Sequence, residues 1–372
     1  MSCLPGVMEM SDETIHVLMG TKGQFIKMAP ILKELDKRGI DYNFIHSGQH
    51  TEITKKISEL FELRKPDVVL DERNEDITKI GQAVYWNLKN MIKSVINRKD
   101  IFQNRRGICL VHGDAVSALQ GLIMAKLAKI KVAHIEAGER THSLYEPFPE
   151  ELVRVLVDRY ADYLFASSDI SYENLINEKV RGQVFNVHLN TICDSIRIAI
   201  ENDIDIEIPS DDYVLATIHR FETIKSKERS RMVVRTLEDI ALERKVLFPI
   251  HRPTRIKFES YGLMERLEAN KNIFISELYD YFSFLKLIKN SNYIVTDGGG
   301  PQEESFFLGV PCLLLRKTTE RMSHPNVYLS EFKTEKIKYF IDNYFKFKIK
   351  SQLSNFSPSK QIVDIIEEIV EK

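Results

Sequence analysis

Short apolar runs alternate with longer segments of helical periodicity along nearly the whole chain, and this alternation restricts the fold more than any other feature. Because the short runs are mainly apolar rather than alternating between apolar and polar residues, they resemble strands of a parallel sheet that helices cover on both faces. The predicted strands form a set of six and a set of five: 15–20, 42–46, 107–113, 132–136, 163–167 and 183–188, then 213–219, 245–250, 272–276, 293–297 and 311–315. The chain is therefore predicted to be an α/β protein with two Rossmann-like, doubly wound parallel sheets.

A break between the two sets of strands divides the chain. Residues 201–212 (ENDIDIEIPSDD) are acidic, contain a proline and lack a helical stripe, which is typical of a linker, and 372 residues suit two domains. We expect an N-terminal extension at 1–14, Rossmann-like domains at 15–205 and 206–355, and a C-terminal helix at 356–372, for which packing back on the first domain is one arrangement. Since open α/β sheets bind ligands beyond the carboxyl ends of their strands, the two domains are expected to face a central cleft.

Charge and composition exclude several classes of function. The 52 basic and 54 acidic residues nearly cancel, so the cationic excess of a nucleic-acid-binding protein is missing. No apolar run approaches the ~20 residues of a membrane helix, and the N-terminus does not resemble a signal peptide. We therefore expect a cytoplasmic protein with neither nucleic acid nor membrane as partner. The four cysteines form no CxxC pair and are interpreted as buried free thiols.

Polar residues follow the predicted strands at equivalent positions in both halves. These residues are Asp114, Glu136, His219, His251 and Asp297. Each one alone fits a cap of the following helix. Because five such positions recur, we favour one shared ligand site.

The segment TDGGGPQEE (296–304) is the clearest candidate for phosphate binding. Its glycines Gly298, Gly299 and Gly300 leave backbone amides accessible, and Pro301 suits the first turn of a helix. Bare amides and the helix dipole together favour a pyrophosphate. Glu304 is expected either to accept hydrogen bonds from a ribose or to complement the helix dipole.

A second glycine-containing turn, GTKGQFIK (20–27), also follows a strand. It matches neither GxGxxG nor a P-loop, so we expect no dinucleotide cofactor. Lys22 and Lys27 either reach an anion from this turn or are ordinary surface charges. Pro30 lies inside the apolar stripe of the same segment and predicts a kink.

Carboxylates gather around Glu136, Arg140 and PFPEE (147–151). Glu150 and Glu151 suit the start of a helix, but in a shared site their pKa values would separate and supply one acid and one base. No HxxxH, HExxH or Cys/His spacing indicates a metal site.

Taken in order, these segments resemble the UDP-N-acetylglucosamine 2-epimerase family over residues 15–330, and its non-hydrolysing branch in particular. The matching motifs are GTKGQFIKMAP, HSGQH, VHGD, HIEAGERT, PFPEE, HRFE, TDGGGPQEE and RKTTER. The resemblance implies a GT-B-like pair of domains and a homodimer that makes precursors of cell-surface polysaccharide. It also implies elimination of UDP from UDP-GlcNAc to a 2-acetamidoglucal, followed by re-addition to give UDP-ManNAc.

The resemblance assigns roles to individual residues. The acid/base carboxylates fall on Asp114, Glu136 and Glu150, and the catalytic histidine falls on His219. The substrate-binding residues are expected to be Lys22, Lys27, Arg140, Arg220, His251, Gly298, Gly299, Gly300, Glu304, Arg316 and Glu320.

Several positions depart from the family pattern. Lys22, Gly23 and Gln24 replace Arg-Pro-Glu, and Gly298 replaces a serine, which removes a hydroxyl donor. Four alternatives remain: a UDP-2,3-diacetamido-uronic acid 2-epimerase, a hydrolysing epimerase, a GT-B glycosyltransferase and a binding protein without catalysis. In the first of these, Arg252 or Arg255 would bind the carboxylate of the substrate.

Overall fold

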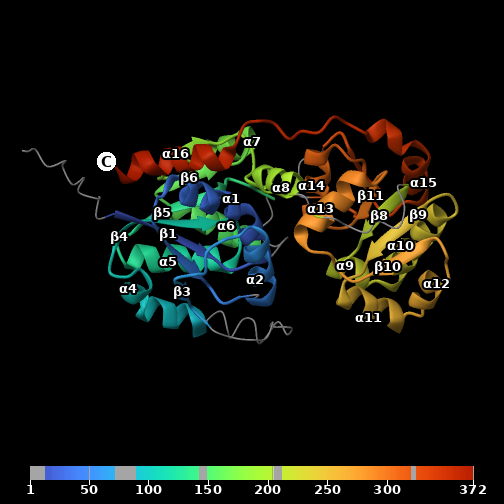
Figure 1. The fold of residues 1–372 in the computed structure, drawn as a ribbon, viewed down its shortest axis with the longest axis horizontal. Coiled ribbons are helices and arrows are strands. Elements are labelled where there is room, and N and C mark those ends of the chain that lie inside the picture. The colour runs from blue at the N-terminus through green and yellow to red at the C-terminus, as the bar shows by residue number, and fades with distance from the viewer. Residues whose placement is uncertain are drawn as a thin grey trace, which may run out of the picture. The chain divides into compact units, whose positions relative to one another are not determined.

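The computed structural model describes residues 13–49, 51–71, 89–141, 149–202, 204, 212–319 and 324–371. The chain forms two compact units, one of Met1–Ser195 with Phe356–Lys372 and one of Ile196–Asn355 (Figure 1). In the described part of the chain, no helix is both long and apolar enough to cross a bilayer.

The first unit contains a seven-stranded parallel sheet in the order β3-β2-β1-β4-β5-β6-β7. Its strands are β1 (Glu13–Met19), β2 (Tyr42–His46), β3 (Val68–Val69), β4 (Arg106–His112), β5 (Lys131–Ala137), β6 (Tyr163–Ala166) and β7 (Gln183–Asn186). All six strands predicted for this half are present. Strand order reverses between β1 and β4, and in such sheets ligands bind at the carboxyl end of that reversal.

Helices cover both faces of this sheet (Figure 1). They are α1 (Lys22–Arg38), α2 (Thr51–Leu60), α4 (Arg98–Ile101), α5 (Val116–Leu127), α6 (Glu150–Tyr160), α7 (Asp169–Asn177) and α16 (Pro358–Val370), while α8 (Ile192–Glu201) leads into the second unit. The C-terminal helix α16 packs beside α1, where Arg38 pairs with Asp364 and Glu367. Its first turn is held by Asp194, which accepts the Ser359 N–H at 2.9 Å.

Pro30 lies inside α1, which runs unbroken from Lys22 to Arg38. A proline has no N–H to donate to the carbonyl four residues earlier, which here belongs to Ile26. The Ser195 hydroxyl donates to that carbonyl at 2.6 Å, and Ser195 is fully buried. A side chain from α8 thus replaces the missing backbone donor in the helix that carries Lys22 and Lys27.

The second unit contains a six-stranded parallel sheet in the order β10-β9-β8-β11-β12-β13. Its strands are β8 (Tyr213–Thr217), β9 (Lys245–Pro249), β10 (Ile273–Ser276), β11 (Ile294–Thr296), β12 (Cys312–Leu314) and β13 (Val327–Leu329). Its helices are α9 (Phe221–Ile224), α10 (Lys227–Ala241), α11 (Arg252–Ser260), α12 (Met264–Glu268), α13 (Tyr281–Asn290), α14 (Gly299–Leu308), α15 (Thr334–Asn343) and the 3₁₀ helix Tyr344–Phe347. The five predicted strands are present, and strand order reverses between β8 and β11.

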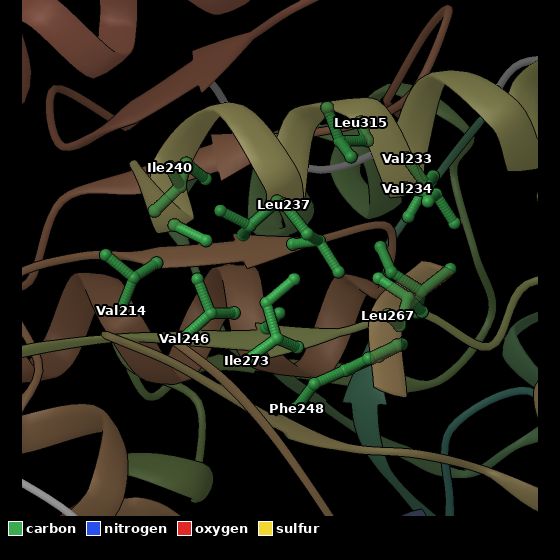
Figure 2. Close-up of a cluster of buried hydrophobic side chains, with 14 of the residues drawn as sticks. Val214, Val233, Val234, Leu237, Ile240, Val246, Phe248, Leu267, Ile273 and Leu315 are labelled. Carbon is green, nitrogen blue, oxygen red and sulfur yellow. The ribbon is translucent and has the colours of Figure 1, made fainter. Parts of the chain in front are cut away.

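Apolar packing fixes α10 on this sheet. Val233, Val234, Leu237 and Ile240 on α10 point toward strand residues such as Val246 (Figure 2). All of these side chains are buried, so the strands whose ends carry the polar residues are held in place by a packed hydrophobic core. The described cysteines Cys109, Cys193 and Cys312 are buried, as predicted.

Candidate functional site

In the first unit, the turn after β1 and the start of α1 are held by Gln24. The Gln24 carbonyl oxygen accepts the Gly20 N–H at 2.8 Å and the Ser117 hydroxyl at 2.7 Å. Its amide nitrogen donates to the His112 carbonyl at 2.7 Å, so one side chain joins the carboxyl ends of β1 and β4. Lys22, the first residue of α1, is exposed beside this junction.

Glu136 lies in a backbone conformation that orients its carboxylate. Its φ is +65°, and the pairing of β5 with β6 shifts register between Ile135 and Ala137, which marks a bulge. A non-glycine residue in this region carries a strain of about 1–2 kcal/mol, and bulges often redirect functional side chains. The Glu136 carboxylate pairs with Lys27 and accepts a hydrogen bond from Asn190. Lys27 and Glu136, which were predicted separately as site residues, are therefore in contact although they lie 109 residues apart in the sequence.

His112 lies next to this carboxylate as a buried, neutral group. Its Nε2 is 3.6 Å from Glu136 Oε2. Burial lowers the pKa of His112 to about 4, with Lys27 and His134 adding to the effect against the opposing carboxylates. A neutral imidazole leaves Lys27 as the cation in direct contact with Glu136.

Asp114 follows β4 and is paired with Arg154 on α6, while Arg154 also contacts Glu151. The Glu136 carboxylate lies over Gly113, 3.9 Å from an ideal Cβ at that glycine. Burial lowers the pKa of Arg154, but the charges of Asp114, Glu151 and Glu136 outweigh burial and raise it. Asp114 and Glu136 therefore flank one short loop. Each carboxylate has its own cation, Arg154 for Asp114 and Lys27 for Glu136.

Glu150 begins α6, four residues before Arg154, so both side chains leave the same face of the helix. Its Oε2 is buried and accepts no hydrogen bond from the described residues. A buried carboxylate oxygen without a donor is costly, so this oxygen is available to a donor on a bound ligand.

Arg140 occupies a different setting from the one expected of a substrate ligand. Its guanidinium forms a bidentate pair with Glu178, at 2.6 and 2.7 Å, and donates to Asp158 at 2.7 Å. Its side chain is 3% exposed. The contacts of Arg140 in this structure are thus internal to the first unit.

In the second unit, the buried Asp297 carboxylate holds the loop after β8. Its two oxygens accept the backbone N–H groups of His219 and Arg220, each at 3.0 Å. The His219 ring lies 4.7 Å from the His251 ring, centroid to centroid. His219 and His251 are thus gathered at the carboxyl ends of β8 and β9, and Arg316 follows β12.

Gly298 caps α14, and Gly299 and Gly300 form its first two positions. An ideal Cβ at Gly298 would lie 2.7 Å from His219 Cε1, so the absence of a side chain leaves room for this ring. The interpretation of Gly298 as a lost hydroxyl donor is therefore incomplete. Glu304 is buried near Tyr281, whose pKa is raised by burial and by the charges of Glu304 and Glu303. Glu320 lies outside the described residues.

Together these groups provide carboxylates with cationic partners in one unit and helix amides with histidines in the other. The first set is suited to proton transfer and the second to an anion. Sequence reasoning missed Arg154, Asn190 and His112 as partners of the carboxylates. Within the described ranges, no group of three His, Cys, Asp or Glu side chains could hold a metal ion.

The chain is similar to known proteins of one family. Residues 33–366 match the family model described as UDP-N-acetylglucosamine 2-epimerase. The UDP-N-acetylglucosamine 2-epimerase of Methanocaldococcus jannaschii is 34% identical over 320 residues, which cover 82% of this chain and 84% of that protein. The enzyme of that name from Campylobacter jejuni is 30% identical and covers 82% of each chain.

Solved structures share the fold. The UDP-GlcNAc 2-epimerase of Methanocaldococcus jannaschii superposes with a TM-score of 0.77 at 31% identity and covers 95% of this chain and 99% of its own. The UDP-GlcNAc 2-epimerase of Neisseria meningitidis, solved with UDP-GlcNAc bound, gives a TM-score of 0.80 at 27% identity and covers 96% and 100%. The prediction of a paired-sheet α/β fold like that of these epimerases is confirmed.

Proposed function

The chain belongs to the UDP-N-acetylglucosamine 2-epimerase family, and from this we propose that it interconverts UDP-GlcNAc and UDP-ManNAc without net hydrolysis. The enzyme is thus an isomerase. The observation that carries the proposal is the strained Glu136, which is held by Lys27 and Asn190 beside the Asp114–Arg154 pair. Backbone strain of this kind is kept where a side chain must be aimed.

The proposed reaction moves one proton and one leaving group. A carboxylate removes the C2 proton while the C1–O bond to UDP breaks, which leaves a C1=C2 double bond in a 2-acetamidoglucal. UDP then adds back to C1, and a proton is delivered to the other face of C2. Nearby carboxylates stabilise the cation-like sugar formed as the bond breaks.

We assign the proton transfers to Asp114, Glu136 and Glu150. Their surroundings differ: Arg154 faces Asp114, Lys27 faces Glu136, and Glu150 Oε2 has no donor among the described residues. An acid and a base in one reaction require different surroundings of this kind. Lys27 also limits the charge that Glu136 brings to the sugar.

The diphosphate is assigned to the glycine turn of the second unit. The N-terminus of α14 offers the amides of Gly299 and Gly300, and His219 lies against Gly298. Arg220, His251 and Arg316 are further proposed contacts, and Glu304 is proposed for the ribose. Lys22 is exposed at the first position of α1, so it is also available to an anion.

A test in D2O separates the possible reactions. The protein is incubated with UDP-GlcNAc, and NMR follows deuterium at C2 together with UDP-ManNAc. We expect exchange into intact UDP-sugar in the wild type, and its loss in Asp114→Asn while UDP binding measured by calorimetry persists. Free sugar with UDP would instead indicate a hydrolysing enzyme. An inert substrate would contradict the proposal, and UDP-diacetamido-uronic acid would be tested next.

We also propose a homodimer formed through the first unit. Large apolar side chains are exposed on three neighbouring segments: Ile92, Ile96, Leu127, Leu152 and Tyr160. The Gln120 amide bonds Ser94 at 2.9 Å, which places residues 89–96 beside α5, and α5 packs on α6. Exposed apolar patches of this kind mark association surfaces. Ile96→Glu is expected to halve the mass measured by light scattering, whereas an unchanged mass would place the interface elsewhere.

A further inference from the structure

His134 lies in the middle of β5 and has no accessible surface. Its Nδ1 is 2.6 Å from Asp158 Oδ1, and its Nε2 is 2.9 Å from the carbonyl oxygen of Gly113. A backbone carbonyl can only accept a hydrogen bond. Thus Nε2 must carry a proton, whatever the state of the other nitrogen.

An ionised Asp158 carboxylate can only accept a hydrogen bond from His134. The other contacts of Asp158 show that its carboxylate is ionised. Arg140, which stays cationic at any pH that proteins tolerate, pairs with Asp158 Oδ2 at 2.7 Å, and both side chains are almost fully buried, so this pair keeps the carboxylate ionised. Its second oxygen accepts from Arg140 at 2.7 Å and from the Gly138 N–H at 3.1 Å. With Asp158 anionic, Nδ1 must be protonated as well.

The charges of the group then balance. His134 and Arg140 supply two cations, and Asp158 and Glu178 supply two anions in direct contact. A buried charge is tolerated when it is paired and hydrogen-bonded in this way. This network also joins two loops, because Gly113 follows β4 and Gly138 follows β5.

We propose that His134 is a doubly protonated positioning residue that fixes the Gly113 carbonyl and thereby the direction of the Asp114 carboxylate. Gly113 has φ +64°, so the chain turns sharply between the end of β4 and Asp114. The hydrogen bond from His134 holds this turn from inside the unit, while Arg154 holds the Asp114 carboxylate itself. The effect on turnover rests on the proposed function, but the protonation state does not.

The protonation state is tested directly by ¹⁵N NMR of protein labelled at histidine. At pH 8 the His134 signals, assigned by their loss in His134→Gln, are expected to show the pattern of a ring protonated at both nitrogens. His112 is the internal control, since burial lowers its pKa to about 4 and it should show a neutral ring. A single-proton tautomer at His134 would overturn the proposal, and this experiment requires no activity.

The positioning role is tested by kinetics of C2 exchange. In His134→Gln we expect kcat to fall about 100-fold, as for small misplacements of a reacting group, with KM within a factor of three. The matched control is His16→Gln, because His16 is equally buried but lies within β1 and bonds Asn43. If His134→Gln and His16→Gln lower the free energy of unfolding by the same amount and lower kcat by the same factor, His134 has only a structural role and the proposed positioning role is wrong. If His134→Gln does not fold, Asp158→Asn replaces it in the same comparison.

Discussion

The hydroxyl of Ser195 is predicted to stabilise the first unit by replacing the donor that Pro30 lacks. The change to test is Ser195→Ala. Ser195 is fully buried, and its Oγ lies 2.6 Å from the Ile26 carbonyl. Alanine removes the donor and leaves a buried carbonyl oxygen unsatisfied in the helix that holds Lys27.

The expected loss follows from that unsatisfied group. Leaving a buried acceptor without a partner costs about 1–3 kcal/mol in the free energy of unfolding. Replacing Pro30 by alanine restores an N–H at the position that normally donates to Ile26. In the Pro30→Ala background, Ser195→Ala should therefore cost less than about 1 kcal/mol, since the carbonyl keeps a donor.

The assay is a double-mutant cycle read by thermal and denaturant unfolding. For a unit of this size each kcal/mol shifts Tm by about 2–4 °C. Hydrogen exchange of the α1 amides assigns the loss to the first unit, because a two-unit chain need not unfold in one step. Equal losses from Ser195→Ala in the two backgrounds would refute the reasoning, and so would no loss in either.

Two further predictions concern the second unit and the response to acid. Gly298→Ser and Gly298→Ala should both lower the rate of C2 exchange by about tenfold or more, with Tm nearly unchanged. The reason is that a Cβ at this position would lie 2.7 Å from His219 Cε1 and displace the His219 ring. A faster exchange with serine alone would show that the hydroxyl matters instead. The free energy of unfolding should fall as pH drops from about 6.5 to about 4. Burial lowers the pKa values of His16 and His112 to about 4 in the folded protein, whereas the same histidines in the unfolded chain take up protons near pH 6.5, so acid in this range favours the unfolded state. When the free energy of unfolding is measured by denaturant across this pH range, it should fall less steeply with acid for His16→Gln than for the wild type. Equal slopes for the two proteins would contradict the explanation.

The sheets were predictable because most of the long strands are mainly apolar and do not alternate between apolar and polar residues. The strands that pattern reading missed are β3 (Val68–Val69) and β13 (Val327–Leu329), each at a sheet edge and only two or three residues long. Runs of this length carry no periodic signal. Their pairing is set by the neighbouring strand, which the sequence does not reveal.

The positions of Asp114 and Glu136 after strands could be read from the sequence, but their partners could not. Lys27 meets Glu136 across 109 residues, and Arg154 meets Asp114 across 40. The bulge at Glu136 carries no glycine that would have signalled a positive φ. Likewise the charge of Arg140 was visible, whereas its contacts with Asp158 and Glu178 depend on the packing of α6 and α7.

The departure from the family pattern at Gln24 has a structural reason in this chain. Glutamine both accepts the Gly20 N–H and donates to the His112 carbonyl, and an ionised glutamate cannot donate. A glutamate would also add a negative charge near Glu136, whose cation is Lys27. The replacement therefore supports the proton-transfer groups through hydrogen bonds, while Lys22 keeps a positive charge exposed on the same turn. It follows that substitutions at Gln24 should act on C2 exchange, and substitutions at Lys22 on the affinity for UDP.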